Sequence, residues 1–187
     1  TSSLFADGDD ILFDISGENS SEIQIPTDLA PSKLWAMNPK GKDYILTATT
    51  GKLVGTMELV KSMNGSFTLN GNQSFTGKTT ASEGTLYVNG TYASPVSVMA
   101  KGTFGGNAIL NGELKINQAL NIEGGRIAPG NGLQEGKLGK MILNGNLNLS
   151  GKTNLHFDIL PTSVYKNDSL IINGDFTLAG VNNVVIN

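Results

Sequence analysis

The chain contains few side chains that could carry out catalysis, and its only histidine is the first to consider. His156 alternates with Leu155 and Phe157, so its side chain projects to the opposite face of a strand. Asp158 lies on the same face two residues on, and serines are plentiful, as a Ser-His-Asp site would require. Nothing in the sequence brings a nucleophile to this pair. We therefore expect His156 to be an outward-facing strand residue without a catalytic role.

An acidic cluster near the start is the next candidate, because Ca²⁺ is bound by six to eight oxygen ligands. The stretch ADGDDILFD contains Asp7, Asp9, Asp10 and Asp14. An EF-hand loop has acidic residues at alternate positions, a central glycine and a closing glutamate, and Gly8 does not fit that order. The nonapeptide of calcium-binding β-rolls is not repeated either. We predict a solvated acidic turn, with no metal site and no cofactor.

Carbohydrate chemistry has two sets of candidates. A glycosidase needs two carboxylates flanking one cleft, and Glu113 and Glu123 lie on neighbouring predicted strands, but nothing in their spacing singles them out. A sugar-binding face needs exposed aromatic side chains. Most aromatic residues here alternate with other apolar residues, which favours core packing, and Trp35 and Tyr44 are the best candidates for exposure. We expect no catalytic residues in this chain.

The composition bounds the class of protein. Glycine makes up 24 of 187 residues, about twice the average usage, and only 16% of residues are charged. Turn formers and β-formers therefore predominate, which predicts an all-β protein. The net charge is −3, without a basic stripe for nucleic acid, and no apolar run approaches the length of a membrane span. The absence of cysteine excludes disulfides and thiolate metal sites.

Short apolar runs recur along the whole chain. Most alternate with period two and are bounded by Gly, Asn, Asp or Ser, as strands are. The predicted strands lie within residues 11–15, 22–25, 43–48, 66–71, 84–90, 94–98, 107–117, 119–128, 140–151, 154–159, 169–180 and 182–187.

An Asn-Gly pair follows five of these runs. The pairs come after Leu69, Val88, Leu110, Leu143 and Ile172, at irregular gaps of about two to three dozen residues. Asn-Gly is the strongest two-residue hairpin signal, so an antiparallel β-sandwich of hairpins is one interpretation. The recurrence of a small unit with insertions favours a parallel β-helix, a solenoid in which glycine and stacked asparagine form the corners. The solenoid is the preferred prediction, and the β-sandwich is its alternative.

The domain prediction is a single segment, 1–187, with an atypical acidic, proline-containing lead-in or cap at 1–42. The least strand-like stretch is 26–44, PTDLAPSKLWAMNPKGKDY. We expect it to be a loop that packs Trp35 over one end of the solenoid, or a coil with an insertion.

The middle of the chain resembles the autotransporter-associated β-strand repeat. That family has a Gly-bounded strand, then Asn, an aromatic residue, Thr-Gly, Thr-Thr, Gly and a short apolar strand. The corresponding residues here are Leu69, Asn72, Phe75, Thr76-Gly77, Thr79-Thr80, Gly84 and Leu86-Tyr87-Val88. The later GTFGGNAILNGELKINQALNIEGGRIAPGNG (102–132) is similar to the element that follows, with its Pro-Gly-Asn turn at 129–131. The resemblance covers most of the chain from about residue 43.

This resemblance implies a right-handed parallel β-helix in a secreted or surface-exposed bacterial protein. The repeat would be a non-catalytic stalk or passenger segment that holds or displays another domain, and Arg126, in the frame GGRIAPG, would be a turn-flanking surface residue. Its partner would be the remainder of its own polypeptide, with no nucleic acid and no membrane insertion. The alternative function is a carbohydrate-binding or accessory module attached to a polysaccharide-degrading enzyme, with surface glycans as partners.

Overall fold

The part of the protein that the structure describes is built from β-strands alone. The computed structural model describes residues 5–17, 22–116, 123–130, 138–159 and 167–186, and no helix occurs among them. The strands are β1 (Asp10–Phe13), β2 (Glu22–Ile25), β3 (Lys33–Met37), β4 (Tyr44–Ala48), β5 (Glu58–Ser62), β6 (Ser66–Asn70), β7 (Thr79–Tyr92), β8 (Val96–Gly106), β9 (Ala108–Leu110), β10 (Leu114–Ile116), β11 (Glu123–Pro129), β12 (Lys140–Leu143), β13 (Leu147–Ser150), β14 (Lys152–Phe157), β15 (Ser169–Ile172), β16 (Phe176–Ala179) and β17 (Asn182–Ile186).

These strands form ladders in which every strand pairing described is parallel. The first ladder contains β1, β3, β5, the beginnings of β7 and β8, then β10, β13 and β16. The second contains β2, β4, β6, the later parts of β7 and β8, then β11, β14 and β17. The prediction of an all-β fold is confirmed. The alternative of an antiparallel β-sandwich is wrong, because neighbouring strands do not reverse direction.

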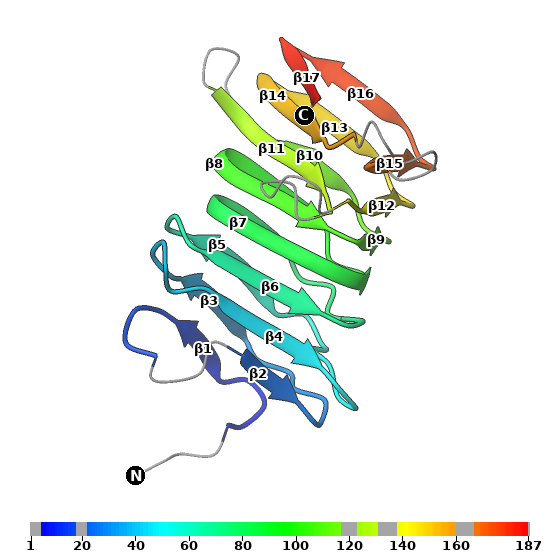
Figure 1. The fold of residues 1–187 in the computed structure, drawn as a ribbon. Helices are drawn as coiled ribbons and strands as arrows, with labels where there is room; N and C mark the ends of the chain where they lie inside the picture. The colour runs from blue at the N-terminus through cyan, green and yellow to red at the C-terminus, as the bar shows by residue number, and fades with distance from the viewer. Residues whose placement is uncertain (1–4, 18–21, 117–122, 131–137, 160–166, 187) are drawn as a thin grey trace.

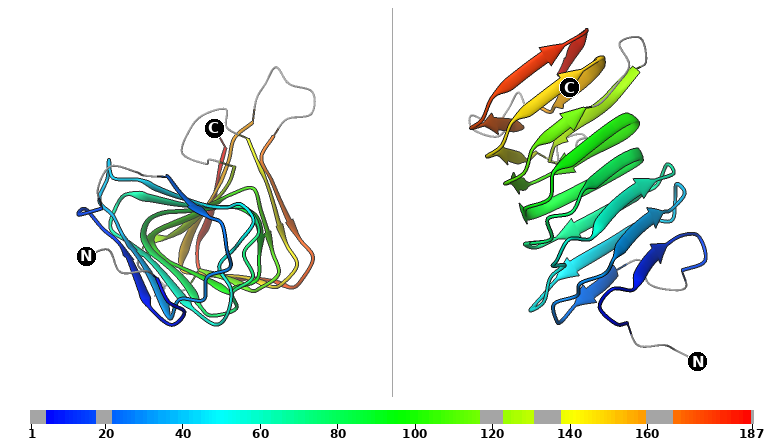
Figure 2. Two further views of the ribbon diagram at one scale, coloured as in Figure 1. Left: turned by 90° about the horizontal axis from the view of Figure 1, so that it is seen from below. Right: turned by 180° about the vertical axis from the view of Figure 1, so that it is seen from behind.

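A third, shorter ladder completes each pass of the chain. It joins the end of β7 to β9, β12 and β15, and isolated parallel bridges at Leu29–Leu53 and Gln73–Tyr92 continue it toward the N-terminus. The chain visits the first, second and third ladders in turn, and we call one such pass a coil. Figure 1 shows the coils piled from the N-terminal to the C-terminal end, and the left view of Figure 2 shows them following a three-sided outline.

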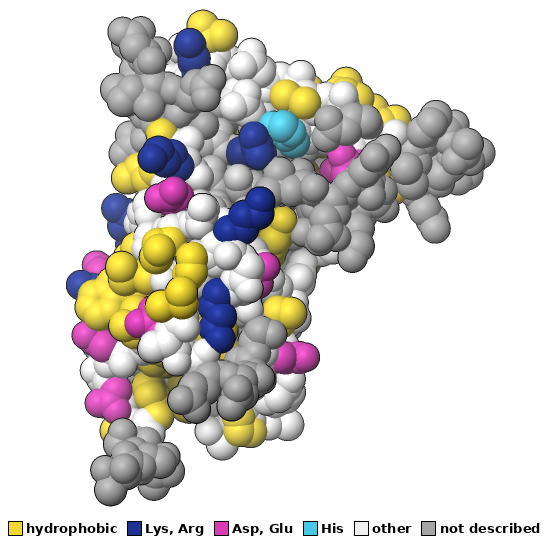
Figure 3. Space-filling view, turned by 60° about the vertical axis from the view of Figure 1, so that its left-hand side comes forward, with side chains coloured by type: hydrophobic (Ala, Val, Ile, Leu, Met, Phe, Trp, Pro, Cys, Tyr) yellow, Lys and Arg dark blue, Asp and Glu magenta, His cyan; other side chains and the backbone are white. Residues whose placement is uncertain are grey.

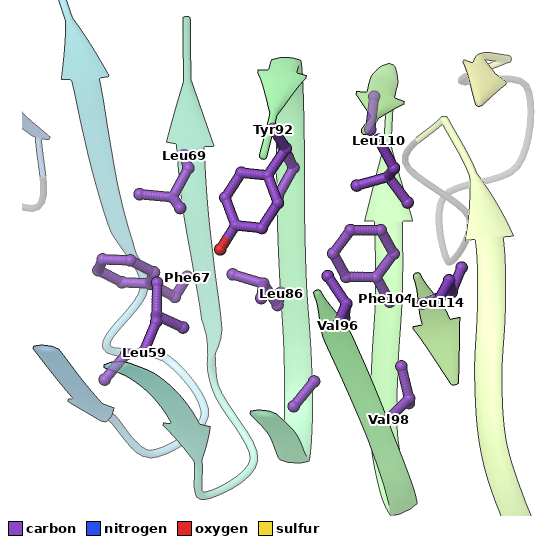
Figure 4. Packing of buried hydrophobic residues seen from close by; sticks show 14 of the residues in the cluster. Leu59, Phe67, Leu69, Leu86, Tyr92, Val96, Val98, Phe104, Leu110 and Leu114 are labelled. Atoms are coloured by element: carbon purple, nitrogen blue, oxygen red, sulfur yellow. The ribbon is translucent and has the colours of Figure 1, made fainter. Parts of the chain in front are cut away.

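The core lies between the ladders as columns of inward side chains. In the second ladder the parallel register places Phe67 beside Leu86, then Phe104, then Ile127, all of them fully buried. Figure 4 shows apolar side chains from neighbouring strands packed against one another along this direction. Because each coil has a neighbour above and below, residues far apart in sequence bury one another.

The strand prediction misses two strands in the N-terminal third, although the predicted strands at 11–15, 22–25 and 43–48 correspond to β1, β2 and β4. The stretch 26–44 is not a loop over one end, because it contains β3, whose central residue Trp35 pairs with Leu12 below and Val60 above. The strand β5 was not predicted either. Both strands extend the first ladder in register, so the lead-in at 1–42 contributes strands that pair in the same way as those of later coils.

Candidate functional site

The asparagines of the Asn-Gly pairs form two hydrogen-bonded ladders. In one, the Nδ2 atom of Asn89 donates to Oδ1 of Asn70 at 2.9 Å. In the other, Nδ2 of Asn144 donates to Oδ1 of Asn111, and Nδ2 of Asn173 to Oδ1 of Asn144, both at 2.9 Å. The partners are 19, 33 and 29 residues apart in sequence. The predicted stacking of asparagine at corners is therefore confirmed, and coil length varies while the corner is preserved.

The glycines of these pairs allow the coils to approach closely. A Cβ atom on Gly145 would lie 2.6 Å from the carbonyl oxygen of Gly112, and one on Gly174 would lie 2.5 Å from that of Gly145. No side chain fits at such distances unless the backbone moves. The Asn-Gly pair thus acts differently here than in a hairpin. The asparagine joins adjacent coils by hydrogen bonds, and the glycine permits the backbones of adjacent coils to lie close together.

Among the residues whose burial the structure describes, one lysine lies in the interior, and the sequence analysis missed it. The side chain of Lys61, on β5, is fully buried, and its Nζ donates to the carbonyl oxygens of Ser62 at 2.6 Å and Met63 at 2.8 Å. Burial lowers the pKa of Lys61 to about 8, against the opposing effect of the carboxylates of Asp43 and Glu83. The signal was present in the alternation of ELVKS, which places Lys61 on the same face as Leu59.

A buried hydroxyl cluster was also missed. The hydroxyl of Thr79 lies 2.7 Å from that of Tyr92 and 2.7 Å from that of Ser94, and Ser94 also donates to the carbonyl oxygen of Gly77. All three side chains are fully buried. Because each hydroxyl has a hydrogen-bond partner, these polar groups are compatible with the apolar core. Their hydrogen bonds also fix the position of β7 relative to the residues that follow it.

The only histidine and the only arginine lie close together on the second ladder. Arg126 of β11 pairs in register with Asn154 of β14, two residues before His156, and Figure 3 shows the histidine next to basic side chains. Burial and then the charge of Arg126 lower the pKa of His156, while Asp158 raises it. Both side chains are partly exposed, as expected for the histidine. No serine hydrogen bond to His156 is found among the described residues, so no Ser-His-Asp arrangement is seen there.

Replacing Arg126 by glutamine is expected to raise the pKa of His156, since the substitution removes the positive charge but keeps most of the bulk. The substitution Asp158→Asn should lower that pKa, because it removes the opposing negative charge. An NMR titration of the His156 ring protons measures both. Equal values in the wild type and both variants would contradict the juxtaposition.

The N-terminal aspartates are used within turns. Oδ1 of Asp7 accepts from the backbone N–H of Ala30 at 3.0 Å, Oδ2 of Asp9 accepts from that of Ala6, and Oδ1 of Asp14 accepts from that of Ser16. The hydrogen bonds with Ser16 also lower the pKa of Asp14. No group of three metal-ligating side chains occurs in the described ranges. The aspartates thus fasten the first turns of the chain.

Two aspartates, Asp158 just after β14 and Asp168 just before β15, are joined by hydrogen bonds. The carboxylate of Asp168 accepts from the backbone N–H of Gly139 at 2.7 Å and from that of Asp158 at 2.9 Å. The backbone N–H of Asp168 in turn donates to the carbonyl oxygen of Asp158 at 3.0 Å. Burial raises the pKa of Asp168. This carboxylate therefore joins two strands, and it was not recognised from the sequence.

The carbohydrate candidates are not brought together. Oε1 of Glu113 accepts from Nδ2 of Asn148 at 2.5 Å, while the side chain of Glu123 lies outside the described part of the chain. Tyr44 is buried, with its hydroxyl donating to the carbonyl oxygen of Asp14 at 2.6 Å, so the expectation of its exposure is wrong. Trp35 does face outward, with Nζ of Lys33 5.5 Å from its ring. On the face drawn in Figure 3, apolar side chains gather in a patch at mid-height on the left-hand side.

Comparisons with family models, curated proteins and solved structures find no match to this chain. The resemblance to the autotransporter-associated repeat therefore stays a prediction. In the described residues there is no helix long and apolar enough to cross a membrane.

Proposed function

We propose that this chain is a right-handed parallel β-helix that serves as a non-catalytic structural module. It would be a stalk or passenger segment of a larger secreted or cell-surface bacterial protein, holding or displaying another domain. The observation that carries the proposal is the repeated order of the three parallel ladders, coil on coil, around one column of buried side chains. The handedness rests on the strong preference of parallel β crossovers for the right-handed sense.

The arrangement suits a spacer because its length depends on the number of coils. Adjacent strands in a ladder are about 4.8 Å apart, so each added coil lengthens the stack by that amount. Backbone hydrogen bonds, side-chain columns and asparagine ladders all run from coil to coil. Bending the stack would disturb all three, which makes it stiff.

The secreted bacterial location rests on the family resemblance, which supports a surface role. The alternative of a carbohydrate-binding module has less support, because Tyr44 is buried and Trp35 is then the one remaining aromatic candidate of the pair. A single outward tryptophan flanked by Leu12 and Val60 is better suited to packing than to a row of stacked sugars.

Removing one whole coil tests the proposal. Deletion of 29 residues, Gly145–Asn173, joins Asn144 to Gly174 and recreates an Asn-Gly corner, because Asn144 and Asn173 are stacked 29 residues apart. It also places β16 over β10. Phe176 would then take the position of Leu147, which pairs with Leu114 in the intact chain. We expect the shortened protein to keep its β-structure, as measured by circular dichroism. Small-angle X-ray scattering should show a particle shorter by about 4.8 Å.

The matched control deletes Gly145–Ile159, which removes the strands of the first and second ladders but keeps that of the third. The chain would then enter the third ladder twice in succession, and we expect loss of cooperative unfolding. If both deletions behave alike, the coil is not the structural unit and the proposal fails.

A further inference from the structure

We propose that the C-terminal face of the stack, formed by β15, β16 and β17, is the docking surface for one further coil of the same polypeptide, stacked in parallel. The inference rests on the proposed function and deepens it by naming the partner of this face. Figure 1 shows these strands as the last level of the pile.

The first argument is the exposure of inward-facing positions. Phe176 and Leu178 of β16 are 48% and 55% exposed, whereas Leu147 and Leu149, with which they pair in the level below, are 0% and 1% exposed. The difference between the two levels is the presence of a covering coil. In the second ladder Val184 and Ile186 are more than 60% exposed as well. Such a face is large and apolar for a surface that meets only water.

The second argument is charge. Free edge strands are usually protected by charged residues or proline, and β15, β16 and β17 contain neither. At the opposite end of the stack, β1 begins with Asp10 and β2 with Glu22. The two ends therefore differ, and the C-terminal one lacks the features that keep an edge from pairing.

The third argument is the continuity of the corner. The hydrogen-bonded asparagine ladder of Asn111 and Asn144 ends at Asn173. The glycines that follow are stacked in the same way, with Gly174 over Gly145 and Gly145 over Gly112. An incoming coil therefore needs an apolar residue followed by Asn-Gly above Ile172. It then needs apolar residues at alternate positions above β16 and β17.

The path of the chain favours a covalently continuous coil over a separate molecule. At Gly90, β7 passes from the second ladder to the third without a break in the strand. A polypeptide leaving β17 in the second ladder can reach the place above β15 by the same short corner.

The experiment adds a second copy of residues 158–186 directly after Ile186. Because Phe157 pairs with Ile186, this segment begins in register. Hydrogen exchange of the backbone amides in the original β16 and β17 is compared among the unextended chain, the extended chain, and a control extended with the same residues in scrambled order. We expect exchange to slow at least tenfold only with the native-order copy, since the copy would cover these strands. A Leu178→Lys substitution in the original β16 should abolish this gain, because the extended chain would bury its ammonium group.

Three results would overturn the inference: no slowing with the native-order copy, equal slowing with the scrambled copy, or concentration-dependent dimerisation of the unextended chain with protection of β15–β17. The last would make a second molecule the occupant. Amide exchange in the inner strands β3–β8 distinguishes failure of this inference from failure of the proposed function. If these amides exchange slowly in every protein tested, the stacked fold is present and only the inference about the C-terminal face fails. If they exchange rapidly, the proposed function fails too.

Discussion

Replacing Gly84 by alanine is expected to lower the free energy of unfolding by about 3–5 kcal/mol, near the upper end for single substitutions. Gly84 lies in β7 with a φ of +71°, a conformation that costs a residue with a Cβ about 1–2 kcal/mol. The added Cβ would also lie 2.3 Å from the carbonyl oxygen of Met63 and 2.4 Å from that of Gly65. Both contacts are with backbone of the coil below, which cannot rotate away as a side chain could.

Two other glycines separate these effects. Gly41 has a φ of +86° with nothing within 4 Å of its Cβ position, so Gly41→Ala should show the backbone cost alone, about 1 kcal/mol. Gly77 lacks a positive φ, but its Cβ would lie 2.1 Å from the carbonyl oxygen of Met57. Urea unfolding of the three variants measures the costs. If Gly84→Ala is no more harmful than Gly41→Ala, crowding between coils does not limit this position.

The corners of the fold could be predicted because their signal is local and repeated. Each Asn-Gly pair follows an apolar residue. Because the pair recurs at gaps longer than a hairpin needs, its repetition favours stacked coils over a series of hairpins. The described structure bears out the asparagine stacking at all five pairs, through the contacts of Asn70, Asn89, Asn111, Asn144 and Asn173.

The faces of individual strands could not be predicted so well. In DYILTA, Tyr44 and Leu46 share one face while Ile45 and Thr47 share the other, and both faces are apolar enough to be buried. Period two therefore defines the two faces without saying which is inside. Similarly, β3 reads KLWAM between Pro31 and Pro39, and the prolines suggested a loop although both lie just outside the strand.

The neighbourhood of Arg126 and His156 depends on register between coils. These residues are far apart in sequence, and the register between β11 and β14 shifts at an irregularity between Glu123 and Arg126. Such a shift changes which residues face each other and has no signature in one sequence. Lys61 is the opposite case: its alternation with Leu59 pointed inward, but no strand was predicted at 58–62, and lysine is rarely buried.

The stability of the protein is expected to rise by about 3 kcal/mol between pH 8 and pH 10.5 through Lys61 alone. Its pKa falls from an ordinary value of 10.5 to about 8 in the folded protein, because burial disfavours the charged ammonium group. Below pH 8 the lysine is protonated in both states and contributes no pH dependence. Between pH 8 and 10.5 the unfolded chain binds the proton and the folded chain does not, so raising the pH favours folding.

The difference between the wild type and Lys61→Met isolates this contribution. Burial raises the pKa values of Tyr44, Tyr87 and Tyr92, and these groups oppose the trend at high pH, but they are present in both proteins. The free energy of unfolding of the wild type relative to Lys61→Met should therefore increase across this range. Urea unfolding at pH 7.5, 9 and 10.5 measures this difference. A flat difference for Lys61→Met would mean that the ammonium group reaches water, and that the corner formed by Ser62 and Met63 is open to solvent.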